Sequence, residues 1–471
     1  MLNIAIIADA STQIGTGHIM RMLSLCDYLK QYAKICFFSR VLEGNLGKFV
    51  LSSGYGQVYT TSLLPDLNGY DVVIVDHYEV TFGMQQKLRA VLPVVVVDDL
   101  FTSISADLVL NHNIYANDSA YQNLVDPETI LCTGAQYALI NRKFLEHNIE
   151  NKAHILVSLG GSDSDNITQK VVELLIKGQR KEPIVVVVGA SNPHYINLKA
   201  IENNQITIVR SVDNMSTLMA QAYFAITAGG TTTLETLAVS IPSIVIEVAD
   251  NQAKIVEHLN KNNLAITYHK DELYQDEFNF SFPTDKEVKK LEKIRFSDRL
   301  DVLVQQIRKL GFSKSTMQKA KLEDMQAVFT LSNETAVRKN SLNTKVIPLK
   351  MHQTWYTKVI DSSDVLFLLF KSKDGTLLAQ VRFSNLLEEE SLIGISLDPE
   401  VRRLKLAGKF LQQALDYYKE QGYRKAIKAQ IKVENDASLA LFKNKGFKIL
   451  CESDEIVWLK FNIKRDNVYN S

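Results

Sequence analysis

The sequence has few cysteines and no arrangement of residues that is typical of a metal site. None of its nine histidines belongs to an HExxH motif or to a comparable metal-binding spacing. The four cysteines form no CxxC pair and lie in apolar or helical stretches, at Cys26, Cys36, Cys132 and Cys451. We therefore expect reduced thiols, as in a cytoplasmic protein, and no bound metal.

An excess of charge of one sign is also missing. The 471 residues include 53 basic and 53 acidic side chains, so the formal net charge is zero. This balance gives no reason to expect nucleic acid or an anionic membrane as a partner. No apolar run approaches the length of a membrane span, and the N-terminus enters a predicted strand without the pattern of a secretory signal. We expect a cytoplasmic protein.

What the chain does have is length and apolar residues. Its 471 residues predict two to four domains, and an apolar fraction of 46% is enough for well-formed cores. The pattern of apolar runs divides the chain into residues 1–148, 149–312 and 320–463. We predict an α/β fold class, with two Rossmann-like lobes followed by a smaller α+β domain.

In the first part, short apolar runs alternate with helical patterns. The runs lie at residues 4–8, 35–38, 72–75 and 94–97. Fully apolar strands between helices predict a parallel sheet that is covered on both faces. Ligands bind beyond the carboxyl ends of the strands in such sheets, so the polar residues that follow each run are candidates for a binding site.

The stretch 14–21 follows the first run and opens a helical pattern. A strand, a glycine loop and a helix start direct backbone N–H groups and the positive end of a helix dipole at a bound anion. Gly15 and Gly17 let the backbone come close to a ligand, and His18 can take up a proton near neutral pH. We interpret the stretch as a phosphate-facing loop that carries a catalytic base. The alternative is a tight turn with a capping histidine.

Polar side chains also follow the third and fourth runs. Asp76 and Tyr78 follow the third run, where an acid and a phenol suit the orientation of sugar hydroxyls or of the histidine. Asp98 and Asp99 follow the fourth run. We expect all four residues to face one crevice, with helix capping or a turn as the alternative for Asp98 and Asp99.

Two further histidines compete with His18 for the role of base. His77 lies between two polar residues at a strand end, and His112 follows the apolar residues 108–110. Neither comes after a glycine loop or at a helix start, so we rank both below His18.

The second part repeats the strand, glycine turn and helix. The run 155–159 precedes the stretch 160–166, which ends with Asn166 at a helix start and suits phosphate binding by backbone amides. The motif AGGTTTLE at 228–235 follows another strand, and its glycine amides and threonine hydroxyls suit a diphosphate. Glu235 is placed to accept two ribose hydroxyls, unless it serves only as a favourable charge for the helix dipole. Two such lobes predict a ligand in the cleft between them.

Several motifs taken together resemble a known family. The segments IGTGHIMR, VDHY, VVDDL, SLGGSDSDN and AGGTTTLE, with a following NQ, are similar to the UDP-sugar hydrolases of pseudaminic acid biosynthesis. Those enzymes resemble nucleotide-sugar glycosyltransferases of the GT-B fold, and the similarity runs from residue 1 to about residue 310. The family removes UDP from UDP-2,4-diacetamido-2,4,6-trideoxy-β-L-altropyranose and releases the free sugar.

The resemblance implies a role for individual residues. The catalytic histidine of the GxGH motif falls on His18, which would act as a general base and activate a water for attack at the anomeric carbon. The departing UDP would be stabilised by helix N-termini and the Gly/Thr loop. The expected substrate and UDP contacts are Gly15, Gly17, Arg21, Asp76, Tyr78, Asn166, Gly229, Gly230, Thr231, Glu235, Asn251 and Gln252.

The third part has a different pattern. Residues 365–371, 376–382 and 391–398 read as consecutive strands without helices between them, which predicts an antiparallel meander. A helix follows the stretch 399–409, and another begins at Asn435 and ends at Gly446-Phe447. The best linker candidate before this domain is residues 311–315.

This arrangement resembles the GNAT superfamily of N-acetyltransferases. The resemblance implies that acetyl-coenzyme A is held by Arg402, Lys405, Ala407, Gly408 and Asn435. Lys405 stands where the family has its first glycine. Phe442 stands where a tyrosine often protonates the departing thiolate, so a domain that only binds the cofactor is an alternative.

A fusion of these activities is chemically coherent, because in the same pathway a GNAT enzyme acetylates a UDP-4-amino sugar before the hydrolase step. Two rival functions stay open. One is a GT-B glycosyltransferase that moves the sugar to an acceptor other than water. The other is a non-catalytic protein that binds nucleotide sugars.

Overall fold

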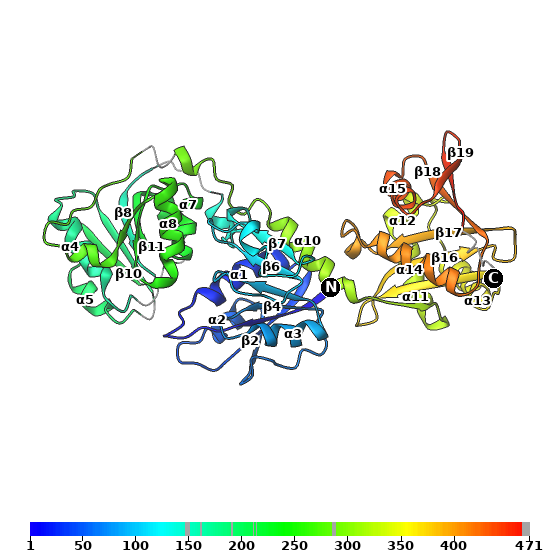
Figure 1. Ribbon diagram of the computed structural model, residues 1–471, viewed down its shortest axis with the longest axis horizontal. Coiled ribbons are helices and arrows are strands. Elements are labelled where there is room, and N and C mark those ends of the chain that lie inside the picture. Colours follow the sequence, from blue (N-terminus) through cyan, green and yellow to red (C-terminus); the bar gives the residue numbers. More distant parts are fainter. Residues whose placement is uncertain are drawn as a thin grey trace, which may run out of the picture. The chain divides into compact units, whose positions relative to one another are not determined.

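The computed structural model describes residues 1–146, 151–160, 163–189, 192–210, 212, 214–284 and 289–463. The chain divides into two compact units, Met1–Ile307 and Arg308–Ser471 (Figure 1). The first unit holds two parallel sheets, and the second holds one mixed sheet. The predicted α/β class, with two Rossmann-like lobes and a third, α+β domain, is confirmed.

The first lobe is built on a seven-stranded sheet in the order β3-β2-β1-β4-β5-β6-β7, and every pair in it is parallel. Its strands are short and almost wholly apolar because helices cover both faces. The strands are β1 (Leu2–Ala8), β2 (Ala33–Ser39), β3 (Gly56–Tyr59), β4 (Val72–Asp76), β5 (Val94–Val97), β6 (Leu108–Asn111) and β7 (Ile130–Thr133), and the helices are α1 (Gly17–Leu29), α2 (Gly47–Ser52) and α3 (Phe82–Val91).

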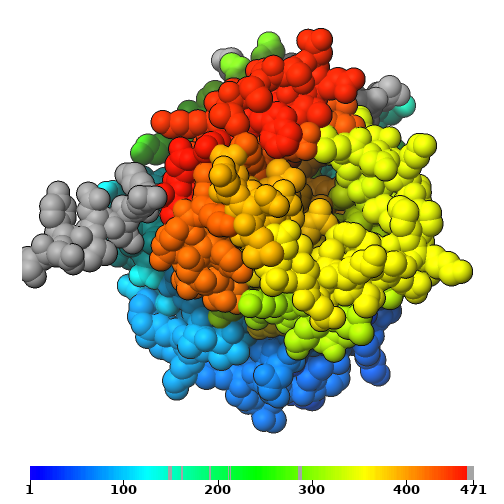
Figure 2. Space-filling model, turned by 90° about the vertical axis from the view of Figure 1, so that its right-hand side faces the viewer, coloured from blue at the N-terminus to red at the C-terminus, as the bar shows by residue number. Residues whose placement is uncertain are grey.

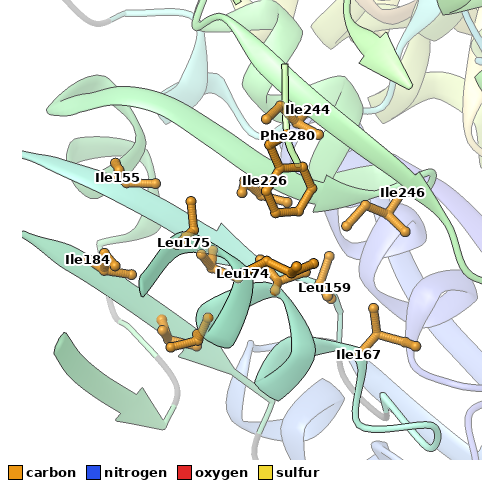
Figure 3. Close-up of a cluster of buried hydrophobic side chains, with 14 of the residues drawn as sticks. Ile155, Leu159, Ile167, Leu174, Leu175, Ile184, Ile226, Ile244, Ile246 and Phe280 are labelled. Atoms are coloured by element: carbon orange, nitrogen blue, oxygen red, sulfur yellow. The ribbon is translucent and has the colours of Figure 1, made fainter. Parts of the chain in front are cut away.

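The second lobe repeats this topology with six parallel strands in the order β10-β9-β8-β11-β12-β13. The strands are β8 (His154–Ser158), β9 (Ile184–Val188), β10 (Ile206–Arg210), β11 (Ala222–Ala228), β12 (Ser243–Glu247) and β13 (Ile266–His269), and the helices include α4 (Ile167–Lys177), α5 (Tyr195–Ala200), α6 (Met215–Ala220), α7 (Thr231–Ala238) and α8 (Ala253–Asn262). Figure 3 shows its core, where Ile155 and Ile226 of the sheet lie near Leu174 and Leu175 of α4.

The strand order of both lobes reverses at one point, between β1 and β4 in the first lobe and between β8 and β11 in the second. A crevice forms at the carboxyl ends of the strands at such a switch point, and ligands of doubly wound sheets bind there. The His18 loop follows β1, and the AGGTTTLE motif follows β11. Both candidate motifs therefore lie at the switch points.

The second unit is built on a seven-stranded sheet in the order β14-β15-β16-β17-β18-β20-β19. Its pairs are antiparallel except for β17 and β18, which are parallel. The strands are β14 (Thr316–Lys319), β15 (Val365–Lys371), β16 (Leu377–Ser384), β17 (Glu390–Leu397), β18 (Ala426–Lys432), β19 (Lys448–Glu452) and β20 (Ile456–Phe461). The expected meander thus corresponds to β15, β16 and β17.

Helices cover both faces of this sheet. Phe367 of β15 packs in one cluster with α11 (Met325–Ser332) and α13 (Leu349–Ile360). On the other face, Phe370 packs against Phe410 of α14 (Ala407–Glu420), with ring centroids 4.7 Å apart. Two shorter helices complete the unit, α12 (Thr335–Asn340) and α15 (Asp436–Asn444). Figure 2 shows the face on which yellow residues, near position 350, lie beside orange residues, near position 400.

Candidate functional site

The loop between β1 and α1 is closed by two backbone hydrogen bonds. The amide of Gly15 donates to the carbonyl oxygen of Ser11 (2.8 Å), and the amide of Ser11 donates back to Gly15 (3.3 Å). Gly15 has a φ of 83°, in the left-handed region that favours glycine. The turn delivers the chain directly to Gly17, where α1 begins, so His18 lies in the first helical turn and is only 8% exposed.

His18 is held by a buried carboxylate. Its Nδ1 lies 2.7 Å from Oδ1 of Asp76, the last residue of β4, and Asp76 is completely buried. Arg21, one turn along α1, donates through Nε to Oδ2 of Asp76 at 2.6 Å and through Nη2 to Oδ1. Burial by itself raises the pKa of Asp76, but the guanidinium of Arg21 and the ring of His18 outweigh it and hold the pKa below its usual range.

This arrangement favours one tautomer of His18. Nδ1 has two neighbours, Oδ1 of Asp76 at 2.7 Å and Nη2 of Arg21 at 3.0 Å. An ionised carboxylate accepts hydrogen bonds only, and we assign the Nδ1 proton to the shorter contact, with Asp76. The Nε2 atom then keeps its lone pair and is the nitrogen able to take a proton from water. The same division of roles between a carboxylate and an imidazole operates in catalytic triads.

Tyr78 and Asp99 complete this cluster. The hydroxyl of Tyr78 donates to Oδ2 of Asp99 at 2.9 Å, and Arg21 reaches the same oxygen at 3.2 Å. The rings of Tyr78 and His18 meet edge to face with centroids 4.7 Å apart. Burial, followed by the charge of Asp99, raises the pKa of Tyr78, so its phenol stays protonated. The other oxygen of Asp99 is buried and has no partner among the described residues.

Asp98 has a different role from its neighbour. Its carboxylate accepts hydrogen bonds from the backbone amides of Leu100 (3.2 Å) and Phe101 (3.0 Å) and from the hydroxyl of Tyr121 (2.6 Å). It therefore holds a turn, which is the alternative that the sequence left open for both aspartates. Only Asp99 belongs to the His18 cluster.

The two competing histidines differ from His18 in their surroundings. Nδ1 of His77 accepts the amide of Glu79 at 3.1 Å, and its Nε2 lies 2.9 Å from Oδ2 of Asp9, so both nitrogens are engaged. His112 is 3% exposed, and burial, helped by the positive charge of Arg21, lowers its pKa to about 4. His112 is therefore neutral at physiological pH.

In the second lobe, the AGGTTTLE motif turns sharply from β11 into α7. A Cβ atom at Gly229 would lie 3.0 Å from the Cβ of Gln252, so a larger residue would have to push this neighbour aside. The side-chain oxygen of Gln252 accepts the amides of Gly229 (3.1 Å) and Val248 (3.0 Å). Gln252 was expected to contact the ligand, but its side-chain oxygen is used in holding the loop. Asn251, which precedes it, is exposed.

A cavity of about 230 Å³ opens beside this turn, at the carboxyl ends of the strands. Its lining includes Ser158, Gly160, Gly189, Thr232 and Glu235. Among the residues that the structure describes, the Glu235 carboxylate has no hydrogen-bond or ionic partner, and burial raises its pKa to about 8. The hydroxyl of Thr233 donates to the carbonyl oxygen of Ala228 at 2.5 Å. Thr231 and Thr232 are therefore the threonines in the first turn of α7 that can contact a ligand.

The glycine turn after β8 differs from the expectation. Asp163 accepts the amides of Ile167 (2.8 Å) and Thr168 (3.0 Å) through its two carboxylate oxygens. The carboxylate of Asp163 thus uses two amides of the first turn of α4 and places a negative charge there, which disfavours a phosphate at this helix start. Asn166 adopts a left-handed φ of 55° and donates to Gln169 at 2.8 Å. Gly161 and Ser162, which belong to the same motif, lie outside the described residues.

In the second unit, the loop between β17 and α14 carries two left-handed residues, Arg403 (φ 64°) and Lys405 (φ 58°). Lys405 stands where the family has a glycine, and the backbone keeps the conformation that glycine favours. The guanidinium of Arg402 pairs with Glu334 and donates through Nη2 to the carbonyl oxygen of Leu397 at 2.9 Å. Its side chain therefore fastens the loop, and the amides at Ala407 and Gly408 begin α14.

The residues of the second half of the expected cofactor motif make contacts within their own helix and loop. The side-chain oxygen of Asn435 caps α15 by accepting the amide of Ser438 at 3.2 Å. Phe442 is 3% exposed and packs edge to face on Phe447, with centroids 4.9 Å apart. Lys445, which the sequence did not single out, lies beside the start of α14, where a Cβ atom at Gly408 would be 3.4 Å from its Cε.

Two parts of the chain match family profiles. Residues 154–321 match the glycosyltransferase family 28 C-terminal domain, and residues 329–447 match the acetyltransferase (GNAT) family. Among the described residues, no helix is long and apolar enough to cross a bilayer, and no group of three His, Cys, Asp or Glu side chains is arranged to hold a metal ion.

Curated relatives support the same division. The UDP-2,4-diacetamido-2,4,6-trideoxy-beta-L-altropyranose hydrolase of Campylobacter jejuni is 28% identical over 277 residues, which is 55% of this chain and 97% of the relative. An uncharacterised protein of Methanocaldococcus jannaschii is 26% identical over 97% of this chain and 99% of its own length. The spermidine N-acetyltransferase of Vibrio cholerae, solved with CoA and spermine, covers 32% of this chain and 96% of its own, with 15% identity and a TM-score of 0.30. By the curated hydrolase and the family profiles, the chain is homologous to a UDP-sugar hydrolase in its N-terminal part and carries a GNAT-type domain after it.

Proposed function

We propose that the first unit hydrolyses a UDP-linked diacetamido-trideoxy sugar to the free sugar and UDP. The observation that carries this proposal is the buried His18–Asp76–Arg21 cluster at a switch point of the sheet, which leaves Nε2 of His18 as a free base. The homology to the Campylobacter hydrolase supplies the substrate class.

The cluster suits attack by water at a sugar carbon. Nε2 of His18 takes a proton as the water oxygen bonds to the anomeric carbon, and the bond from that carbon to the diphosphate oxygen breaks with its electron pair leaving on UDP. Asp76 stabilises the imidazolium that forms, and Arg21 keeps Asp76 ionised. A positioned general base of this kind contributes roughly 10²–10⁴-fold to the rate.

The second lobe would hold the nucleotide. The amides and hydroxyls of Thr231 and Thr232 at the start of α7 suit the diphosphate. The Glu235 side chain has no other partner among the described residues, and two ribose hydroxyls that donate to its carboxylate would favour its ionised form. The N-terminus of α4 suits an anion less well than the N-terminus of α7, because the carboxylate of Asp163 already accepts two amides there.

The second unit would transfer an acetyl group to the amine of a UDP-linked amino sugar. Acetyl-coenzyme A supplies the acetyl thioester, and the left-handed loop with the amides at the start of α14 fits its diphosphate. The substrate named for the Campylobacter relative carries two acetamido groups, and N-acetylation is the reaction class that makes an acetamide from an amine. Phe442 offers no proton, so the thiolate would take its proton from another source.

The test is a mass-spectrometric assay of the purified protein with a UDP-4-amino sugar, with and without acetyl-coenzyme A. Free diacetamido sugar that forms only with acetyl-coenzyme A supports both activities. A second substrate is the UDP-sugar that already carries both acetamido groups. If only this pre-acetylated UDP-sugar is turned over, the result supports the hydrolase alone. A glycoside in place of free sugar would indicate a glycosyltransferase, and the absence of UDP release from either substrate would refute the hydrolase.

A further inference from the structure

The second unit holds a cavity of about 560 Å³ at one end of its sheet. Four positive side chains line it, and no carboxylate is among the described residues of its wall. Since the whole chain has 53 basic and 53 acidic residues, this local excess of positive charge does not follow from the composition. The four positive side chains are Lys419, Arg424, Lys448 and Lys460, and Gly446 and Phe461 form a further part of the wall.

The cavity lies away from the loop suited to acetyl-coenzyme A. That loop follows the end of β17 at Leu397 and leads to Ala407 at the start of α14. The cavity lies where Phe461 of β20 pairs with Ile427 near the start of β18, and because β17 and β18 are parallel, this is the other end of the sheet. Lys419 is near the C-terminal end of α14, about 18 Å along the helix axis from Ala407 at 1.5 Å per residue. The cavity is therefore separate from the amides at the start of α14.

The four positive side chains differ in their ionic partners. Lys460 pairs with Glu390 at 2.6 Å, and Lys419 has an acidic neighbour one helical turn before it at 3.5 Å. In the part of the chain that the structure describes, no carboxylate pairs with Arg424 or Lys448. Two of the four charges are thus left for a ligand.

Arg424 is held in place through one of its nitrogens. Its Nη1 donates to the carbonyl oxygens of Lys419 (2.5 Å) and Tyr423 (3.1 Å), at the end of α14. Its Nε and Nη2 have no acceptor among the described residues. A guanidinium that is fixed in this way presents its remaining donors in one plane, which suits the oxygens of a phosphate.

Lys448 and Lys460 face each other across β19 and β20. The antiparallel register pairs these two residues directly, and like charges at such a position destabilise a sheet. Glu390 compensates the charge of Lys460, but Lys448 has no such neighbour in the described chain. An anion in the cavity would offset this repulsion, whereas the free protein bears its full cost.

The aromatic wall of the cavity suits a flat ring. Nζ of Lys419 lies 5.7 Å from the centroid of the Phe461 ring, within the range of a cation–π contact. Phe447 stacks on the same ring at 5.1 Å and holds it in place. Gly446, with a φ of 88°, brings only backbone to the ring, where a Cβ atom would lie 3.4 Å from Cε2. A positive charge beside a fixed aromatic ring suits a base that is joined to a phosphate.

We propose that this cavity binds a nucleoside diphosphate, with the phosphates at Arg424 and Lys448 and the base against Phe461. Two phosphate groups match the two positive side chains that lack a carboxylate partner. The volume of about 560 Å³ is within the range of small-molecule sites. The site goes beyond the proposed acetyl transfer, and it holds whether or not the unit transfers acetyl groups.

Tryptophan fluorescence of the intact protein, with ADP as the probe, tests the site. The two tryptophans are Trp355 on α13 and Trp458 on β20, so the signal comes from the second unit. ADP should change the fluorescence saturably, and Arg424→Gln and Lys448→Gln should each raise its Kd roughly 10–100-fold, the loss expected for hydrogen bonds between charged groups. The matched control is Lys443→Gln, an exposed lysine of α15 outside the cavity, which should leave the Kd within about twofold. A Kd that stays within about twofold of wild type in both cavity variants, or no binding of ADP by fluorescence and by calorimetry, would overturn the proposal.

Two further arms test the base contact and the separation from the acetyl-coenzyme A site. Phe461→Leu should raise the Kd for ADP roughly tenfold and leave the Kd for inorganic pyrophosphate within about twofold. An equal loss for both probes would overturn the base contact. Lys448→Gln should leave the Kd for acetyl-coenzyme A within about twofold, and a rise as large as the one for ADP would overturn a separate site.

The stability of the free protein separates a binding role of Lys448 from a structural one. Without ligand, Lys448→Gln should be at least as stable as wild type, because the repulsion across β19 and β20 is gone. Urea denaturation followed by tryptophan fluorescence measures this in the second unit. A variant that loses stability together with its affinity for ADP would contradict the binding role and overturn the proposal.

Discussion

The unpartnered Glu235 carboxylate makes nucleotide binding dependent on pH. With a pKa of about 8 in the free protein, Glu235 is mostly protonated at pH 7. Two ribose hydroxyls that donate to it favour the ionised form and lower its pKa, because they supply the hydrogen bonds that the free carboxylate lacks. Binding at pH 7 should therefore release a proton.

The size of this effect follows from the titration of a single group. At pH 7 about nine-tenths of the Glu235 side chains carry a proton, so binding should release about 0.9 proton, falling to about 0.1 near pH 9. Removing that proton at pH 7 costs about 1.4 kcal/mol, so the affinity should be about tenfold weaker there than on the plateau above pH 8. The bound state holds fewer protons than the free state, and the affinity therefore rises with pH.

Isothermal titration calorimetry measures the protons directly when it is repeated in buffers of different ionisation enthalpy. His18→Ala slows turnover of the UDP-sugar ligand roughly 10²–10⁴-fold, so that binding can be measured first, and the diphosphate of this ligand does not titrate in this range. Glu235→Gln in the same background is the control, and it should abolish both the proton release and the rise of affinity with pH. Equal proton release by the two proteins, or an affinity that falls as the pH rises toward 8, would refute the reasoning.

Three further substitutions test the remaining parts of the account. His18→Ala should lower turnover roughly 10²–10⁴-fold and leave the Kd for UDP almost unchanged; near-normal turnover in a steady-state assay would exclude His18 as the base. Asp76→Asn should lower turnover and also destabilise the fold by about 3–5 kcal/mol, because Arg21 loses its buried, charged partner. A midpoint of urea denaturation equal to that of the wild type would contradict this prediction. Lys405→Gly should raise the free energy of unfolding by about 1 kcal/mol while coenzyme A still binds, because the left-handed backbone no longer carries a Cβ atom. An unchanged or lower unfolding free energy would argue against strain at that position.

The fold could be predicted from the sequence because its signals are local and repeated. The fully apolar runs that became β1, β4 and β8 have no solvent-facing side, so they had to form parallel sheets covered by helices. Gly15 and Gly229 marked turns that favour glycine, one for its positive φ and the other for its tight packing. These requirements act within a few residues, so they can be recognised from the sequence alone.

The partners of individual side chains could not be predicted in the same way. Gln252, Arg402 and Asn435 were expected at ligands, and the structure shows each of them bonded to the backbone of its own loop or helix. The sequence also does not tell Asp98 from Asp99, because a turn and a cluster around Arg21 both accept a carboxylate. Asp163 was the exception that could have been found, since aspartate a few residues before an apolar helical run is a common capping signal.

The central claim is that water activated by His18 attacks the anomeric carbon, and hydrolysis in ¹⁸O-labelled water tests it most directly. The bond that breaks then lies between carbon and oxygen, so the bridging oxygen leaves with UDP and the label enters the sugar. The label should be read in UDP, because a free reducing sugar exchanges its anomeric oxygen with the solvent. Unlabelled UDP is the result that the account predicts. Labelled UDP would mean that water attacks phosphorus, and it would contradict the role given to His18.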